Sequence, residues 1–237
     1  MLISEAVQRW WPLPSSLDLV RAPVKVTAAA VLAEVTRFVA GQGLAAAWTP
    51  FSSLDQVFGS VAVFTNVPTV YFVLPTRSEW TVLWNNSFLC DGYDSLCWCL
   101  TKNHGLDTLH WQSSDNDAVF QAGSLFNFRQ RTDAGLIERS VYCCKDDAHW
   151  EFHAKGEPLA HEDLAAYSTR RKRDRLNEHG MLGLLERLGA RPWEDEFYLP
   201  GEAYRIERVE YPQAIKHKKF SEFACERSCH GASSATF

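Results

Sequence analysis

Apolar residues recur with a helical period near the start of the chain. Between residues 27 and 40 they fall at relative positions i, i+1, i+4, i+7 and i+8, which places one apolar stripe on a helix. Gly41 and Gly43 follow, and glycine is favoured just after the end of a helix. The pattern predicts an amphipathic helix over residues 27–40 that packs against a core, and then a loop containing Pro50.

Short runs rich in β-branched and aromatic residues come next, and such runs are typical of strands. They cover residues 58–64, 69–75, 79–84 and 106–111. The second of these runs is apolar on both faces, which favours an interior position in its sheet. Before the last run we expect a helix over about residues 94–104, capped by Asp91 or Asp94 and ended by Gly105.

Three further strand-like runs follow without room for helices between them. They cover residues 118–130, 136–145 and 148–156, and short polar turns separate them. Consecutive strands joined by short turns indicate an antiparallel meander. The chain is therefore expected to be an α+β protein with a largely antiparallel, possibly mixed, sheet, packed helices and a C-terminal helical segment.

The residue pattern changes from strand-like to helix-like after residue 158. A helical pattern follows, rich in charge, with a break expected around His179 and Gly180 and a last strand within residues 197–212. The expected organisation is an α+β sheet domain over 1–158, a helical extension packed on the same domain over 159–211, and a partly mobile tail over 212–237.

Composition and charge narrow the possible functions. Hydrophobic residues make up 46% of the chain and charged residues 22%, as in a globular protein. The formal net charge is −5, and residues 1–160 carry the excess, with 11 basic and 16 acidic side chains. An acidic surface repels nucleic-acid phosphates and attracts basic partners. We therefore expect a basic-surfaced protein partner rather than nucleic acid.

The start of the chain and its cysteines suggest where it resides. The first residues show no basic segment before an apolar run, and Pro12 and Pro14 interrupt them, so we expect no secretory signal. The longest apolar stretch is too short for a membrane span. Seven cysteines, an odd number without regular spacing, favour reduced thiols. The expected location is the cytoplasm, without a membrane partner.

Cys90 is the strongest candidate for chemistry. It lies just before the helix predicted at 94–104, where a helix N-terminus lowers the pKa of a thiol, and His104 or His149 would serve as its base. This arrangement would make a thiol-dependent enzyme. The competing interpretation is that Cys97 or Cys99 and their neighbours fill a core, and that the polar residues around Cys90 form turns and caps.

Other residue clusters suggest metal or nucleic-acid sites less well. The side chains of two residue pairs lie too far apart in a strand to bind one metal ion: the adjacent Cys143 and Cys144 point to opposite faces, and His149 and His153 are four positions apart. We therefore expect no metal and no cofactor. The Cys and His residues at 225–230 lack a second pair of zinc ligands nearby in the sequence. Five positive charges within residues 170–175 leave open a nucleic-acid-associated regulator, the second alternative function.

Two stretches, residues 74–96 (LPTRSEWTVLWNNSFLCDGYDSL) and 150–176 (WEFHAKGEPLAHEDLAAYSTRRKRDRL), look like family motifs. In general character the chain resembles the immunity proteins of bacterial polymorphic toxin systems, which are acidic, cytoplasmic, tryptophan-rich α+β proteins. No functional residue carries over from this resemblance. It implies stoichiometric inhibition of a cognate toxin by occlusion of the toxin's active site.

The sequence contains no P-loop, no dinucleotide-binding glycine motif and no nucleophile elbow. The leading hypothesis is therefore a non-enzymatic cytoplasmic binding protein, an immunity protein that neutralises a toxin. Its contact surface would combine aromatic anchors with an acidic rim. The carboxylates expected in that rim lie in predicted turns: Asp115, Asp117, Asp146 and Asp147.

Overall fold

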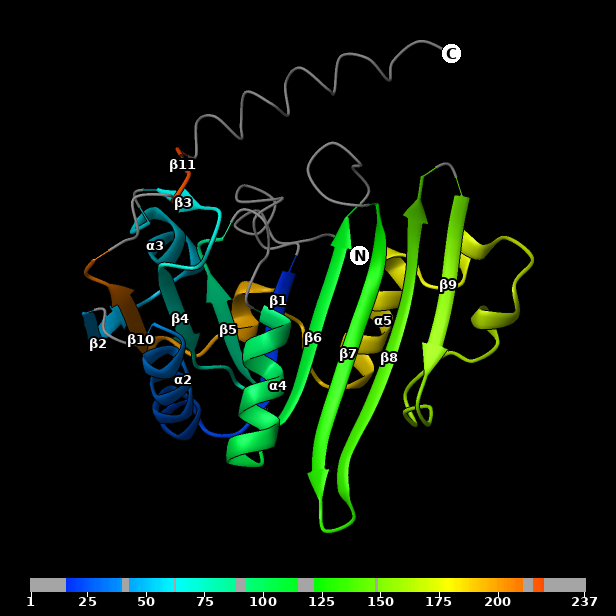
Figure 1. Ribbon diagram of the computed structural model, residues 1–237, viewed down its shortest axis with the longest axis horizontal. Helices are drawn as coiled ribbons and strands as arrows, with labels where there is room; N and C mark the ends of the chain where they lie inside the picture. The colour runs from blue at the N-terminus through cyan, green and yellow to red at the C-terminus, as the bar shows by residue number, and fades with distance from the viewer. Residues whose placement is uncertain are drawn as a thin grey trace.

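The computed structural model describes residues 16–39, 43–61, 63–87, 93–114, 122–147, 149–210 and 215–219. The described residues form one large antiparallel sheet of nine strands with helices on both of its faces (Figure 1). The predicted α+β class is thus confirmed. The strand order is β2-β10-β4-β5-β1-β6-β7-β8-β9, and every pair of neighbours is antiparallel.

The strands of this sheet are β1 (Ser16–Arg21), β2 (Leu44–Phe51), β4 (Val70–Leu74), β5 (Thr81–Asn85), β6 (Asp107–Ser114), β7 (Gly123–Thr132), β8 (Gly135–Asp146), β9 (His149–Lys155) and β10 (Gly201–Arg208). A separate pair joins β3 (Phe64–Thr65) to β11 (His217–Lys218). The α-helices are α2 (Val24–Phe38), α3 (Leu54–Gly59), α4 (Tyr93–His104) and α5 (Glu178–Arg187). Short 3₁₀ turns η2 (Ala166–Ser168), η3 (Lys172–Asp174) and η4 (Asp195–Phe197) complete the described elements.

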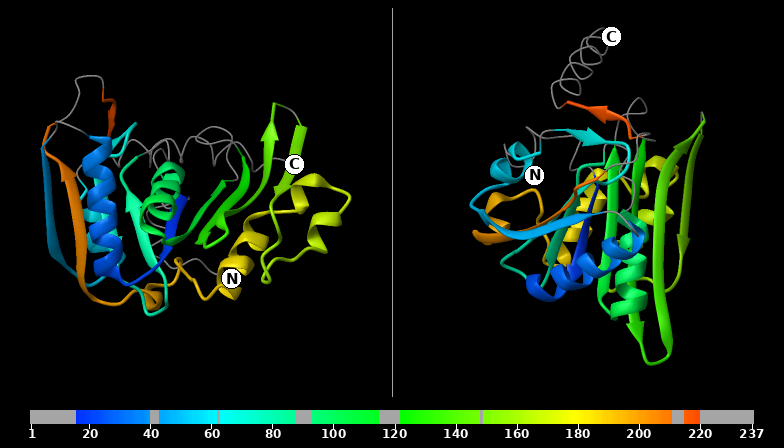
Figure 2. Two further views of the ribbon diagram at one scale, coloured as in Figure 1. Left: turned by 60° about the horizontal axis from the view of Figure 1, so that its bottom comes forward. Right: turned by 60° about the vertical axis from the view of Figure 1, so that its left-hand side comes forward.

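Helices α2 and α4 match two helices that the sequence predicts, and they cover one face of the sheet (Figures 1 and 2). Val31 and Val35 of α2 and Leu100 of α4 are buried in one cluster with Ile206 of β10. Gly105 ends α4 with a φ of 68°, a left-handed conformation that glycine adopts without strain. Residues that recur at helical spacing therefore build this side of the core.

The other face of the sheet carries a larger core that α3, α5 and the segment between α5 and β10 cover. Trp80 and Trp84 are fully buried there with Leu185 of α5. The indole Nε1 of Trp80 donates a hydrogen bond of 2.8 Å to the carbonyl oxygen of Leu188, so this large side chain is buried with its polar atom satisfied.

The C-terminal part of the chain contributes a strand to the interior of the sheet. β10 lies between β2 and β4, and α5 shares its core with β1, so residues 159–210 and the preceding sheet have a continuous interior. The last strand predicted within 197–212 is confirmed as β10. Of the predicted tail over 212–237, only residues 215–219 belong to the described part of the chain.

Three local predictions are wrong. Pro50, expected in a loop, belongs to strand β2. This strand lies at the edge of the sheet, where proline is tolerated. No strand spans 58–64 in the described residues, because α3 continues to Gly59 and β3 begins only at Phe64. The two helices expected after residue 158 reduce to α5, which runs through the break expected at His179 and Gly180, preceded by η2 and η3. Side-chain contacts to the sheet hold the segment before α5 in an irregular path.

Helices α2 and α4 leave part of their face of the sheet uncovered. In Figure 1 α2 lies in front of the β10 and β4 side of the sheet and α4 lies near β1, whereas no described helix lies in front of β8 and β9. We call the surface of β7, β8 and β9 on this side the open face.

Candidate functional site

The open face is built by the register of three meander strands. Alternate side chains of a strand point to the same face, so the cross-strand pairs Tyr142 with His153 and Asn127 with Ser140 all point toward it. Together with neighbouring side chains they line a shallow hollow of about 420 Å³. This hollow lies beside the N-terminal end of α4, whose Asp94 contacts Asn127.

An aromatic pair forms the centre of the open face. The rings of Tyr142 and His153 stack with centroids 4.7 Å apart and planes inclined by 26°. Tyr142 remains 37% exposed, which is unusual for a large aromatic residue in a sheet. Stacking fixes the tyrosine ring in place before any partner binds, so little side-chain entropy would be lost on association.

Carboxylates border this pair at one end of the strands. Glu151 accepts a hydrogen bond of 2.8 Å from Nζ of Lys172, and this bond lowers the pKa of Glu151. Asp146 lines the same hollow, is exposed, and makes no ion pair with any described residue. The open face therefore carries one neutralised and one unpaired carboxylate beside its aromatic centre.

The border toward α4 is a network around a buried arginine. The guanidinium of Arg129 donates to both carboxylate oxygens of Asp94, at 2.7 and 3.0 Å, and to Glu138 at 2.9 Å. Although partial burial opposes it, the Arg129 guanidinium lowers the pKa of Asp94. Asp94, which was expected as a helix cap, thus ties the start of α4 to β7.

A second polar pair lies deeper in the sheet, and the sequence analysis missed it. Nδ1 of His110 is 2.8 Å from Oδ1 of Asp18, and both side chains are buried. Burial raises the pKa of Asp18, although the hydrogen bond with His110 opposes this. The ring of Tyr93 stacks on His110 with a centroid distance of 6.2 Å. His110 does not line the hollow of the open face, and the pair links β1 to β6.

A polar residue within an apolar strand run was the only available signal for this pair. Asp18 stands among Leu17, Leu19 and Val20, and His110 stands between Leu109 and Trp111. Each position alternates with residues of the opposite core, so its side chain had to point to the face of α4. Nothing in the sequence shows that strands separated by 92 positions become neighbours.

The cysteines of the described residues are protonated thiols. Burial raises the pKa of Cys97, Cys99, Cys143 and Cys144, that of Cys144 to about 11, and the nearby Asp18 carboxylate adds to the effect at Cys97. A thiol with a raised pKa is a poor nucleophile near neutral pH. Cys97 is fully buried, in agreement with its interpretation as a core residue, and Cys143 is fully buried as well.

The residues of the predicted thiol site are not brought together within the described part of the chain. Cys90 lies outside the described residues, so a thiol enzyme centred on it stays a prediction. His104 ends α4, and its Nε2 lies 2.7 Å from Oε1 of the buried Glu34 in α2. His149 is exposed at the start of β9, opposite Asp146. His104 thus joins two helices, and His149 borders the open face.

The asparagines before Cys90 have structural roles, and Asn85 bonds a nearby backbone group as the turn-and-cap interpretation predicts. Oδ1 of Asn86 accepts hydrogen bonds of 2.9 Å from the backbone of both Thr69 and Val70. Oδ1 of Asn85 accepts a bond of 2.8 Å from the backbone N–H of Ser87. The Asn86 contacts secure the end of β5 against the start of β4, and the Asn85 contact closes the turn that follows β5.

Two of the four carboxylates expected in the acidic rim lie in the described part of the chain. Asp146 and Asp147 are exposed where β8 ends, and Asp147 has a positive φ of 51°, as aspartate tolerates in turns. Asp115 and Asp117 lie outside the described residues. In the part of the chain that the structure describes, no group of three or more histidine, cysteine or acidic side chains is arranged to hold a metal ion. The cluster at 225–230 also lies outside it.

The basic run over 170–175 does not form a continuous helical patch. Lys172 pairs with Glu151, Arg173 pairs with Asp174 at 3.6 Å, and the guanidinium of Arg175 lies over the ring of Phe152. Contacts within the protein thus already engage three of the five positive charges of this run, and a nucleic-acid-associated regulator stays a prediction.

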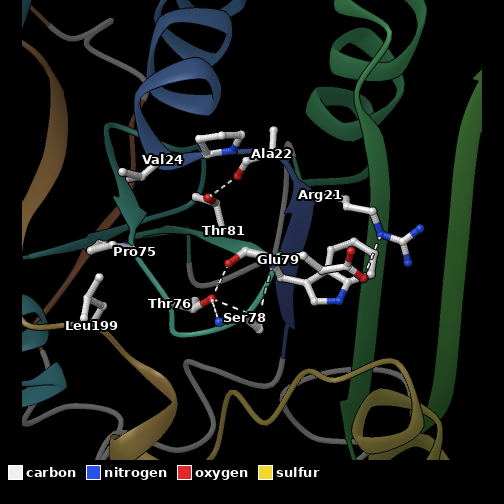
Figure 3. Close-up of a pocket in the computed structure, with 11 residues that line it drawn as sticks. Arg21, Ala22, Val24, Pro75, Thr76, Ser78, Glu79, Thr81 and Leu199 are labelled. Atoms are coloured by element: carbon white, nitrogen blue, oxygen red, sulfur yellow. Dashed lines mark hydrogen bonds and ion pairs between the residues drawn. The ribbon is translucent and has the colours of Figure 1, made fainter.

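A second hollow, of about 490 Å³, lies where β1 turns into α2 (Figure 3). The guanidinium of Arg21 lies 4.6 Å from the centre of the Trp80 ring and 3.2 Å from a carboxylate oxygen of Glu79. The hydroxyls of Thr76 and Ser78 are 3.0 Å apart and bond each other. Because its polar groups are engaged with one another, this hollow offers a ligand fewer polar contacts than the open face.

No protein-family model, no curated protein and no solved structure matches the chain. Among the described helices, none combines the length and the apolar character needed to cross a membrane.

Proposed function

We propose that the protein is a non-enzymatic binding protein of the bacterial cytoplasm that neutralises a cognate toxin, and that the open face is its contact surface. The toxin would present a basic surface to this face and be inhibited by occlusion of its active site. The observation that carries the proposal is the exposed, stacked pair of Tyr142 and His153 in a hollow that also contains the unpaired carboxylate of Asp146.

Aromatic side chains support this role because they dominate interface energies when they become buried against a partner. Tyr142 is held by stacking on His153, so it is already oriented for contact. The unpaired carboxylate of Asp146 would select a cationic side chain, and the net charge of −5 would speed the encounter with a basic partner. A surface of this kind favours recognition.

A thiol-dependent reaction has little support on this face. Cys144 lines the same hollow, and burial raises its pKa to about 11, so its thiol is protonated at neutral pH. Binding of a protein partner would use the aromatic pair and the carboxylate of this hollow, and it requires no nucleophile.

The proposal is tested by finding the partner and then asking which residues the inhibition requires. The full chain is used for affinity capture in its native host, and the stoichiometric partner is then expressed alone and together with the protein. We expect the partner to arrest growth alone and the wild-type chain to restore growth. A Tyr142→Ala, Asp146→Lys variant should bind at least about tenfold more weakly and fail to restore growth.

Phe38→Ala provides the matched control, since Phe38 is also an exposed aromatic residue and lies on α2, away from the open face. This variant should restore growth as well as the wild type does. Recovery of no stoichiometric partner, or a captured partner that is harmless when expressed alone, would overturn the proposal. Circular dichroism of both variants establishes that they are folded.

A further inference from the structure

The two edge strands of the sheet differ in how they are protected. β9, at one end, carries charged or ionisable side chains at alternate positions, from His149 through Glu151 and His153 to Lys155. β2, at the other end, has the sequence LAAAWTPF with no charged residue. Natural edge strands are normally blunted by charges, bulges or proline, because an unprotected edge pairs with other strands. β2 carries such a device only at its end, where Pro50 stands.

The side chains of β2 leave its outer edge accessible. Ala45, Ala46 and Ala47 are all exposed, although β2 pairs along its whole length with β10. Their small side chains allow another backbone to approach closely. In Figure 1 β2 lies at the end of the sheet, with β10 as its neighbour on the inner side.

The hydrogen bonds of β10 show which groups of β2 point outward. The N–H of Val209 donates to the carbonyl oxygen of Gly43 at 2.9 Å, and the N–H of Arg208 donates in the opposite direction, to Thr69 beside β4. Because backbone groups alternate in an antiparallel strand, the odd-numbered residues of β2 bond to β10. The N–H and C=O groups of Leu44, Ala46 and Trp48 therefore point to the outer edge.

No described residue bonds the outer edge of β2 through its backbone. Pro50 has the same phase as Ala46, so its nitrogen, which lacks a proton, also points outward and costs no bond to β10. The edge thus presents unpaired donors and acceptors over a stretch without charge. Such groups are ordinarily paired, either with water or with another strand.

We infer that β2 is a self-pairing edge, through which two copies of this chain join their sheets antiparallel about a twofold axis. Side chains that pair across such a joint must point to the same face, which requires a register with an even sum of residue numbers. With Ala46 opposite its own copy, Leu44 lies opposite Trp48 of the partner subunit.

This register agrees with the chemistry of the strand in three respects. The outward groups of Leu44, Ala46 and Trp48 each meet outward groups of the other copy in closely spaced hydrogen-bond pairs. The small Ala46 side chain lies on the axis, and apolar side chains flank it. Pro50 falls beyond the paired stretch. A second copy of this chain is the occupant that the edge fits, because an uncharged strand meets its own copy without electrostatic repulsion.

Hydrogen exchange of the wild-type chain tests this inference with an internal control. The amides of Ala45 and Ala47 bond to β10, so we expect them to be protected at every protein concentration. The amides of Leu44, Ala46 and Trp48 should exchange about three- to fivefold more slowly at about 500 µM than at about 5 µM, since a contact made by one strand from each copy is small and weak and the monomer fraction falls only gradually with concentration.

Sedimentation equilibrium measures the association directly. The wild type should shift from a mass of 26.9 kDa toward twice that value as concentration rises. Ala46→Lys and Ala46→Pro should remain monomeric, the second because it removes one outward donor without touching β10. Ala154→Lys, an exposed alanine on the opposite edge, is the matched control and should associate as the wild type does. A wild type that is monomeric throughout, or equal exchange of the outward amides at both concentrations, would overturn the inference.

Discussion

At the scale of single residues, buried charges join elements that the chain order keeps apart. Arg129 in β7 holds Asp94 of α4 and Glu138 of β8, and Glu34 in α2 accepts a hydrogen bond from Asn103 of α4 and lies within bonding distance of His104. A buried charge without its partner is costly, so each of these contacts makes the position of its element specific. The open face owes its border along α4 to the first of these networks.

The Asp94 contact predicts a dependence of stability on pH. Because Arg129 lowers the pKa of Asp94 in the folded protein, the ionised carboxylate stabilises the fold above the ordinary pKa of about 4 and loses this effect as the pH falls through the folded value. Asp94→Asn should therefore lower the free energy of unfolding at pH 7 by about 1 kcal/mol, a modest value because Asp94 is half exposed.

Urea unfolding of this variant and the wild type at pH 7 and at pH 2.5 measures the effect. The difference between them should shrink at the lower pH, because the carboxylate of the unfolded wild type is then protonated and ionisation of Asp94 no longer contributes its full stabilisation. Asp133→Asn, an exposed position in the turn between β7 and β8, serves as a control and should change neither value. An equal difference at both pH values would show that the charge of Asp94 is not responsible.

At the scale of elements, the segment between β9 and α5 shows how a side-chain contact overrides local preference. The guanidinium of Arg139 in β8 donates two hydrogen bonds to the carboxylate of Glu162, at 2.9 and 2.5 Å. Glu162 also accepts a bond of 3.0 Å from the hydroxyl of Tyr167. Both charged groups are almost completely buried, so the segment is attached to the sheet rather than coiled into a long helix.

Loss of this attachment should release the segment. Glu162→Gln leaves the Arg139 guanidinium buried without its counter-charge, and we expect a loss of about 3 kcal/mol in the free energy of unfolding. Limited proteolysis should cut first between residues 157 and 176, and urea unfolding gives the size of the loss. Glu157→Gln, an exposed neighbour, should behave as the wild type. A Glu162→Gln variant within about 0.5 kcal/mol of the wild type would contradict this structural role.

The elements that could be predicted from the sequence depend on local signals. Periodicity over 27–40 located α2, cap residues flanking 94–104 located α4, and alternation with short turns located the meander from β7 to β9. β2 escaped prediction because Pro50 suggests a loop in isolation, and only its pairing with β10, about 150 residues later, makes it a strand. The wrong helices after residue 158 have a similar cause, the distant Arg139.

The candidate site was predictable only in part. Asp146 was identified from its place beside a turn, whereas Tyr142 was missed because an aromatic residue in a strand normally points into a core. Its exposure follows from the number of helices that cover the sheet, which is a property of the whole fold. The pairing of Tyr142 with His153 follows from the register of β8 and β9 once their turn is known.

At the scale of the whole molecule, one sheet has three distinct surfaces. Its middle is covered on both sides, its open face at β7 to β9 carries an aromatic and acidic hollow, and its opposite edge at β2 is uncharged. The open face and the β2 edge lie at opposite ends of the sheet (Figure 1). Pairing of two copies through β2 would therefore leave both open faces accessible to partners.

Site-specific crosslinking in living cells of the native host asks most directly whether the open face is the contact surface. A photoreactive amino acid replaces Tyr142 in one variant and Phe38 of α2 in another, both at exposed positions. The variant substituted at position 142 should crosslink to a single basic protein that is toxic when expressed alone, and the variant substituted at position 38 should not. Crosslinking to that protein from position 38 but not from position 142, or from neither, would contradict the role of the open face.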